Sequence, residues 1–307
     1  EWIVFAAGLA IAGRALPAQA EESAEGHRLE EVTVTADEPG GPFLPDVEGT
    51  KIFAGKKTTV ANLDEGPEVQ ANNYRQAFSQ LPGLLIAEQA APSHANFNYR
   101  GVGDPHETEY LLVLKDGIPL VSDWFGYSTL YYQPVTESVQ RVELLRGGSA
   151  LLYGPQPGPA LNYVTYPPPA DTRLTARTQS IFGSDGLYSL YNSAGGTAGP
   201  VGYLGYHAYR HGDGARPNAD FTVHTGGAKV VIDPEDASRW TLAMDAYQSE
   251  SGEAGRLTLA QYGANRDFGR TPNDRIWIER YMPSLTYERE VSDDTLLVTK
   301  SWMGYQD

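Results

Sequence analysis

The chain has 307 residues, of which 41% are hydrophobic, and it contains 33 glycines, 21 prolines and 19 tyrosines, a composition typical of strands joined by many turns. The formal net charge is −16, and Lys and Arg are scattered along the sequence, which argues against nucleic acid as a partner. The absence of cysteine excludes disulfides, thiolate metal sites and cysteine nucleophiles.

An apolar run opens the chain. The segment from Ile3 to Ala12 is too short to cross a bilayer as a helix, and Ala18-Gln19-Ala20 follows it as an A-x-A cleavage pattern. We interpret residues 1–20 as a cleaved export signal; a buried N-terminal helix is the alternative. No other stretch approaches the ~20 apolar residues of a transmembrane helix, so any membrane crossing has to use strands.

Residues 21–51 form an acidic tail rich in Gly and Pro, a composition that favours a flexible chain. Its centre is the segment from Glu30 to Thr35, where Val32, Thr33 and Val34 are β-branched and favour a strand. No hairpin partner stands nearby. The segment is therefore either a strand that pairs outside its own tail or an incidental β-rich patch.

Residues 52–169 show a mixed α and β pattern. Asn73 is placed to cap a short helix whose apolar residues recur at helical spacing, and Pro82-Gly83 ends it. Two apolar runs flank Lys115-Asp116-Gly117, where Asp-Gly predicts a tight hairpin turn. Further strands are expected from Val139 to Leu145 and from Ala160 to Tyr166. The region is predicted to be a compact α+β domain.

Residues 170–307 follow a proline run and alternate between apolar and polar residues, as a strand with one wet face does. From Arg239 to Gln248 one parity carries Trp240, Leu242 and Met244, and the other carries Thr241 and Asp245. Roughly seven such antiparallel strands are expected, near 172–182, 187–198, 201–211, 219–232, 238–249, 276–290 and 294–305.

The connections between these strands tend to alternate between short and long, as in outer-membrane barrels. A soluble β-sandwich is the alternative, but Tyr and Trp near the strand ends favour an interfacial aromatic girdle. An open sheet would leave a bare edge, which lipid does not tolerate. We therefore infer the N-terminal part of a larger transmembrane barrel, and hence a fragment.

Catalytic motifs begin in this sequence but are not completed. His106-Glu107 starts an H-E-x-x-H zinc motif whose second histidine position is Tyr110. Gly101-Val102-Gly103 starts a dinucleotide fingerprint without its third glycine, and Gly147 to Leu151 lacks the last glycine of a nucleophile elbow. The six histidines show no ligand spacing with carboxylates. We expect no enzyme activity, no catalytic residue and no bound metal.

Taken together, the order of these segments resembles the TonB-dependent outer-membrane receptors, and within them the ferric dicitrate receptor group. Five motifs carry the resemblance: Ala77 to Gly83, Arg100 to Gly103, Asp116 to Leu120, Val139 to Gly147, and Arg146 to Gln156. Two features depart from that group. The usual G-G-x-x-N appears as Gly158-Pro159-Ala160-Leu161-Asn162, and the extra periplasmic signalling domain is absent between the signal and the tail segment.

The resemblance implies an α+β plug domain inside a barrel of about 22 strands in the full protein, located in the Gram-negative outer membrane. It implies active uptake of a ferric chelate, such as ferric citrate or another siderophore, with iron as cargo and no cofactor. The partners would be TonB with its inner-membrane energising complex, the chelate and outer-membrane lipid. Uptake of haem, cobalamin or a glycan, or a passive porin or adhesive barrel, are the alternatives.

The resemblance also assigns roles to residues. TonB would bind the tail segment, whose residues are Glu30, Glu31, Val32, Thr33, Val34 and Thr35, by adding a strand to it. Arg100 and Arg146 would latch the plug to barrel glutamates, unless they are simply solvated. Ligand would meet residues of two plug loops: Ser93, His94, Asn96, Asn98, Trp124, Phe125, Tyr127, Tyr131 and Tyr132. Packing between plug and barrel is the other reading of these aromatic residues. Loop arginines are further candidates for an anionic chelate: Arg216, Arg256, Arg266 and Arg270.

Overall fold

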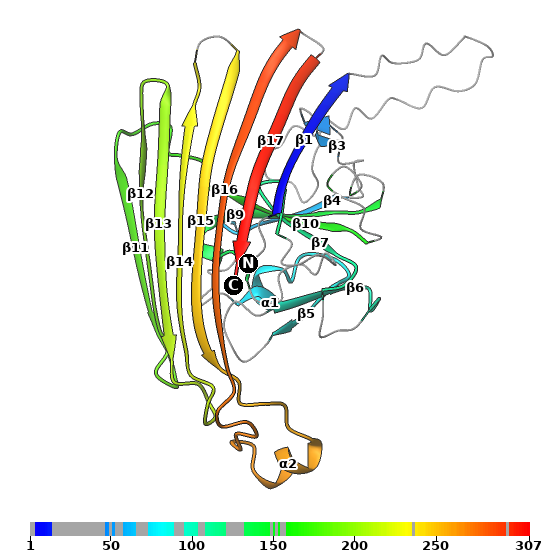
Figure 1. Cartoon of the computed structure of the whole chain (residues 1–307), viewed down its shortest axis with the longest axis vertical. Coiled ribbons are helices and arrows are strands. Elements are labelled where there is room, and N and C mark those ends of the chain that lie inside the picture. The colour runs from blue at the N-terminus through cyan, green and yellow to red at the C-terminus, as the bar shows by residue number, and fades with distance from the viewer. Residues whose placement is uncertain are drawn as a thin grey trace, which may run out of the picture.

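A computed structural model describes two packed parts of the chain, a curved antiparallel sheet and an α+β domain beside it (Figure 1). The described residues are 4–13, 47–48, 51–52, 58–65, 73–88, 95–103, 108–120, 132–147, 150, 153, 158–234, 237–292 and 295–307. Among them, no helix is long and apolar enough to cross a membrane.

Seven strands of the sheet follow one another in chain order, each antiparallel to the next, and we call them the wall. They are β11 (Thr175–Phe182), β12 (Tyr188–Ala198), β13 (Val201–Gly212), β14 (Phe221–Ile232), β15 (Ser238–Gly252), β16 (Arg275–Ser292) and β17 (Thr295–Gln306). The predicted set of roughly seven antiparallel strands is confirmed. A barrel of about 22 strands stays an expectation for the full protein.

An eighth strand, β1 (Val4–Gly13), pairs antiparallel with the outer edge of β17, with Ala7 opposite Ser301. The pairing satisfies the backbone groups of an edge that would otherwise be bare. It falls within the predicted export signal at residues 1–20. Cleavage of that signal is a matter of processing, which strand pairing does not test, so the signal stays a prediction.

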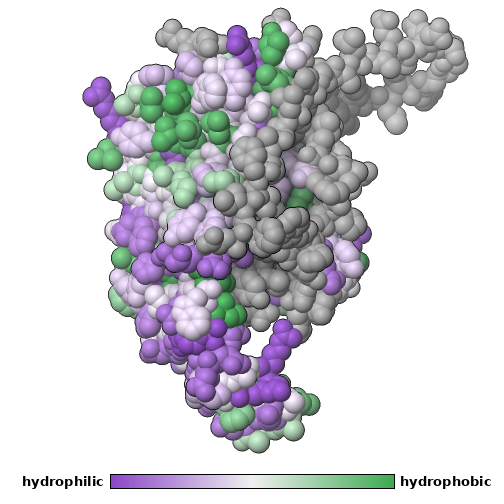
Figure 2. All heavy atoms as spheres, viewed as in Figure 1, coloured by the Kyte–Doolittle hydropathy of each residue, from purple (hydrophilic) through white to green (hydrophobic). Residues whose placement is uncertain are grey.

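The two faces of the wall differ as the alternation predicts. Trp240, Leu242 and Met244 of β15 are 39%, 45% and 38% exposed on the face turned away from the α+β domain. Thr241 and Asp245, of the other parity, line a cavity against that domain. On the visible side of the molecule, hydrophobic residues gather over the upper half of the sheet, and hydrophilic ones dominate the lower end (Figure 2).

Long and short connections alternate along the wall, also as predicted. β12 and β13 are joined by Gly199-Pro200 alone, whereas residues 253–274 between β15 and β16 form a long loop that carries α2 (Leu259–Ala264) at the lower end of Figure 1. A capping box between Thr258 and Gln261 starts α2.

The α+β domain contains a five-stranded sheet, in which the order is β4-β9-β10-β7-β8. Its strands are β4 (Thr58–Asn62), β7 (Leu112–Lys115), β8 (Ile118–Pro119), β9 (Val139–Leu145) and β10 (Ala160–Thr165). Smaller elements surround it: β2 (Val47–Glu48), β3 (Lys51–Ile52), α1 (Tyr74–Ala77), β5 (Leu84–Glu88), β6 (Ala95–Tyr99) and the 3-10 helix η2 (Thr136–Ser138). The predicted helix, hairpin and two strands are all present, and the Asn73 side chain caps α1 by accepting from the Gln76 N–H.

One hydrophobic core joins the two parts. Phe78 packs against Phe97 and Tyr163 inside the α+β domain, with ring centroids 5.6 and 5.7 Å apart. The same cluster continues into the wall through Val223 and Ile278, among others. The α+β domain is therefore seated on the wall by apolar packing as well as by the polar contacts described next.

Candidate functional site

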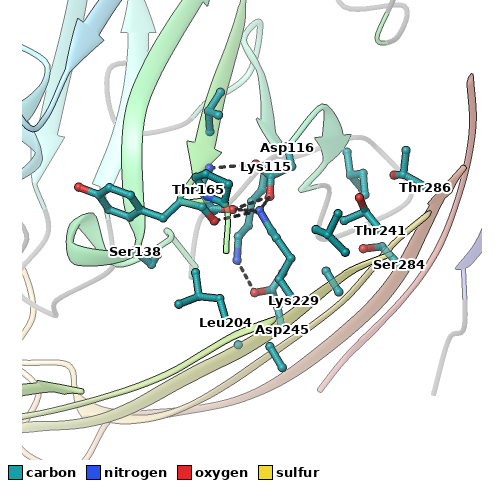
Figure 3. Close-up of a pocket in the computed structure, with 18 of the residues that line it drawn as sticks. Lys115, Asp116, Ser138, Thr165, Leu204, Lys229, Thr241, Asp245, Ser284 and Thr286 are labelled. Atoms are coloured by element: carbon teal, nitrogen blue, oxygen red, sulfur yellow. Dashed lines mark hydrogen bonds and ion pairs between the residues drawn. The ribbon is translucent and has the colours of Figure 1, made fainter. Parts of the chain in front are cut away.

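The turn between β7 and β8 is where the α+β domain meets the wall (Figure 3). Asp116 and Gly117 have φ values of 50° and 73°, the positive values that a two-residue hairpin turn requires. The Asp116 N–H donates to the Tyr163 carbonyl at 2.8 Å, and the Gly117 N–H donates to Asn162 Oδ1 at 2.9 Å. Both bonds fix the turn to β10 of its own domain.

The Asp116 carboxylate joins β10 to the wall. It accepts hydrogen bonds from the Thr165 N–H at 2.9 Å and the Thr165 hydroxyl at 2.7 Å, and Lys229 Nζ of β14 lies 3.0 Å from its Oδ2 atom. Burial alone would raise the pKa of Asp116, but the Lys229 ammonium and the Thr165 hydrogen bonds outweigh burial and hold that pKa below its ordinary value. The carboxylate is therefore charged at physiological pH.

Lys115, the residue before Asp116, forms a second ion pair with the wall, in which the α+β domain supplies the positive charge. The Lys115 ammonium, with its side chain 6% exposed, contacts the carboxylate of Asp245 on β15. Burial opposes the charge on Lys115, but the Asp245 carboxylate reverses that effect and raises the pKa of Lys115 above its ordinary value. The Lys115 ammonium is accordingly charged, and its burial is compensated by a carboxylate partner.

A third strand of the wall holds the backbone of the turn. Lys300 Nζ of β17 donates to the Asp116 carbonyl at 2.9 Å. Together, Lys229, Asp245 and Lys300 connect β14, β15 and β17 to two consecutive residues of one turn, and we call these contacts the clamp.

A cavity of about 430 Å³ lies beside the clamp. Its lining includes Asn162 and Thr165 from the α+β domain and Thr241, Ser284 and Thr286 from the polar parity of the wall. Figure 3 shows the Lys115, Asp116, Lys229 and Asp245 side chains converging between the two parts.

A buried chain of polar contacts supports the turn from behind. Asn162 Nδ2 donates to Glu143 Oε2 at 2.9 Å, and Glu143 Oε1 accepts from Arg141 Nε at 2.9 Å. Glu143 is fully buried, so the Arg141 guanidinium supplies the opposite charge that its burial demands.

The predicted site residues fall in several places. Asn96 and Asn98 are buried in β6, and Tyr132 is buried with its ring 5.1 Å from that of Tyr247 and with Arg280 5.2 Å above it. The aromatic ring of Tyr132 thus packs between the α+β domain and the wall. The remaining predicted ligand residues (Ser93, His94, Trp124, Phe125, Tyr127 and Tyr131) and the tail segment (Glu30, Glu31, Val32, Thr33, Val34 and Thr35) lie outside the described residues.

The two predicted latch arginines differ in their surroundings. Arg100 has a φ of 54°, and its guanidinium lies 5.1 Å from the ring centroid of Tyr99. Arg146 Nη2 donates to the Thr59 hydroxyl at 2.7 Å. Of the loop arginines, Arg216 donates to the Gly255 carbonyl at 2.9 Å and so braces the long loop. The latch and ligand roles remain predictions.

Comparison with known proteins identifies the α+β domain. Residues 51–158 match the family model of the TonB-dependent Receptor Plug Domain. These residues are therefore similar to the plug domain of the TonB-dependent receptors. The wall, which packs on this plug, accordingly has the place of the barrel in that fold.

Relatives of the chain agree with this assignment. It is 30% identical over 142 residues to the vitamin B12 transporter BtuB of Photobacterium profundum, an alignment that covers 46% of the chain and 22% of BtuB. The ferric citrate transporter FecA is similar in structure, with a TM-score of 0.68, 24% identity, and coverage of 81% of the chain and 40% of FecA. The ferric yersiniabactin uptake receptor FyuA from Yersinia pestis is also similar in structure, with a TM-score of 0.59 and 20% identity. This match covers 81% of the chain and 41% of FyuA. The chain thus spans less than half the length of each.

These relatives are transporters and receptors rather than enzymes, in agreement with the incomplete catalytic motifs of the sequence. The structural likenesses, at identities below 25%, concern the fold.

Sequence reasoning recognised the Asp116-Gly117 turn of the plug but missed its partners Lys229, Asp245 and Lys300. The available signal was the presence of charged residues on the polar parity of strands that the sequence predicts to cross a membrane, where such residues are costly unless they face an interior partner. The ion pair between Lys229 and Asp116 joins residues 113 positions apart in the sequence, and no local sequence pattern indicates a contact across such a separation.

Gly117→Ala tests how closely the wall approaches the plug turn. A Cβ at Gly117 would lie 2.6 Å from Lys300 Nζ, and residue 117 has a positive φ, whereas a Cβ at Gly199, also at positive φ, meets no atom within 4 Å. We expect Gly199→Ala to show only the backbone cost of about 1–2 kcal/mol. Gly117→Ala should lose about 1–2 kcal/mol more, because Lys300 is displaced from the Asp116 carbonyl. Thermal unfolding of the full-length protein in detergent measures both variants, and equal losses would contradict the contact.

Proposed function

We propose that this chain belongs to an outer-membrane transporter that actively takes up a ferric chelate, ferric citrate-like or another siderophore, into the periplasm. The observation that carries the proposal is the plug held on the polar face of the wall by charged contacts from three strands. A barrel wide enough to need such a plug is closed at rest, so passage requires energy to move the plug. Similarity to FecA supports the choice of a ferric chelate.

TonB, coupled to its inner-membrane energising complex, is the proposed source of that energy. The segment from Glu30 to Thr35 would add to a TonB strand by β-augmentation, within an acidic tail that lets it reach into the periplasm. Iron would travel as part of the chelate, so the transporter itself needs no cofactor. Arg100 and Arg146 are proposed as latch residues of the plug, and export by a cleaved signal completes the proposal.

Cobalamin is a second candidate substrate. The 30% identity to the vitamin B12 transporter BtuB over 142 residues favours it, although the matched part is only 22% of BtuB. Haem and glycans would use the same plug-and-barrel architecture. A passive porin is disfavoured, because the clamp closes the interface between plug and wall.

Uptake measurements separate these functions. The full-length protein, expressed in cells that lack their own ferric citrate and cobalamin receptors, would be supplied with radioactive iron as ferric citrate or with radioactive cobalamin. We expect iron to accumulate in cells with TonB and not in cells without it. Accumulation of cobalamin alone would favour the second candidate, and iron uptake that persists without TonB would establish a passive channel.

A further inference from the structure

The cavity between plug and wall ends at the clamp. Thr286 and Arg239, near the ends of the wall that carry the short links, line one side of the cavity, and Asp245 lines the other. Short links mark the periplasmic side of outer-membrane barrels. One step further along β15, Tyr247 packs against Tyr132 of the plug, with ring centroids 5.1 Å apart. The Lys115-Asp116 turn therefore separates a periplasmic cavity from a tightly packed stretch.

The two ion pairs of the clamp run in opposite senses. Lys115 of the plug contacts an acid of β15, and Asp116, the next residue, contacts a base of β14. Lys229 and Asp245 are diagonal neighbours on adjacent strands, because Lys229 pairs with Ala243 and Gly227 pairs with Asp245. An exchange of partners would bring lysine to lysine and aspartate to aspartate. The turn can therefore dock at one position only, and a small displacement loses both attractions.

The contact from β17 has a different character. Lys300 holds a backbone carbonyl of the turn, so its bond does not depend on either plug side chain. Release of the turn from the wall thus breaks contacts with three strands.

We propose that the Lys115-Asp116 turn is the gate of the substrate's exit route, which runs through the cavity to the periplasm and is shut by the clamp. The inference rests on the proposed transport function, which supplies the substrate that would use this route. The gate itself is defined by the contacts between the plug and the wall. Movement of the turn would let the cavity extend into the packed stretch between β14, β15 and the plug.

Charge exchange across the Lys115–Asp245 pair tests the gate. The full-length protein would be reconstituted in lipid vesicles loaded with a small fluorescent dye, and passive efflux would be recorded without TonB or chelate. Lys115→Asp and Asp245→Lys each place like charges together, and we expect efflux to rise at least about tenfold, because an uncompensated buried charge is strongly destabilising. The double variant restores an attractive pair, and its efflux should return toward the wild-type value.

Arg239→Asp is the matched control. It changes the charge in the same cavity by as much as Lys115→Asp, but Arg239 is exposed and pairs with Asp233 of the wall, 3.6 Å away. Its efflux should equal that of the wild type. The gate is overturned if the single variants leak no more than this control, or if the double variant leaks as much as they do.

Folding is checked on the same samples by the heat-dependent shift in gel mobility that folded barrels show. If a single variant fails to fold, Lys115→Met and Asp245→Asn replace the charge reversals, with the same expected order of efflux. Because dye efflux requires neither TonB nor a chelate, a failure of ferric uptake would overturn the proposed function and leave this result unchanged.

Discussion

Val34→Pro should abolish energised uptake while leaving binding of the chelate at the cell surface intact. Proline has no N–H to donate to a strand ladder and fixes its own φ, so a proline at the centre of the Glu30–Thr35 segment removes the backbone pairing that β-augmentation needs. The proposed chelate site does not include this segment, so surface binding should be unaffected. Accumulation of radioactive chelate at 37 °C, compared with binding on ice, measures the two quantities on the same cells.

Two control variants locate this effect in the strand pairing. Val34→Thr keeps the N–H and the β-branched side chain and should transport as the wild type does. Glu38→Pro places a proline outside the Glu30–Thr35 segment, next to Pro39, and should also transport. Normal uptake by Val34→Pro would contradict the role of this segment, and loss of surface binding would point to misfolding instead.

Leu242→Lys should destabilise the membrane-inserted protein far more than Thr241→Lys. Leu242 lies between Trp240 and Met244 on the exposed apolar parity of β15, whereas Thr241 lines the polar cavity. A lysine on the lipid face costs about 2–4 kcal/mol at the bilayer centre and less toward the interfaces, while substitutions on the inner face are tolerated. Folding into lipid vesicles over a range of urea concentrations gives both free energies of unfolding.

The pair of variants is matched in strand, depth and introduced charge, so only the face differs. A larger loss for Thr241→Lys would mean that the faces are reversed. Equal, small losses would mean that neither face contacts lipid, as expected of a soluble β-sandwich.

Local chemistry made much of the fold predictable from the sequence. The period-two alternation located β15 at 238–249, against an observed Ser238–Gly252, and the last residues were missed because polar Glu250 and Ser251 continue the strand beyond its apolar part. The Asp-Gly pair predicted the β7–β8 turn, because few other residues accept positive φ at two successive positions.

The site was less predictable, for a physical reason. Asp116 was assigned to a turn, yet its carboxylate is placed by Thr165 and Lys229, which the fold brings in from 49 and 113 residues away. Such pairings follow from how strands of the plug and wall are packed, and a single sequence shows only that charged residues occupy the inner parity. The latch roles of Arg100 and Arg146 were predicted from the family resemblance, and these roles stay predictions.

The core that spans plug and wall makes the two parts a single cooperative unit. Val223 and Ile278 of the wall belong to the same buried cluster as Phe78 and Phe97 of the plug. A wall folded alone would present these side chains to water, as an unfinished half of a core. Assembly of the protein therefore has to bring the plug to the wall before that surface finds another partner, and heating should melt plug and inner wall in one step rather than two.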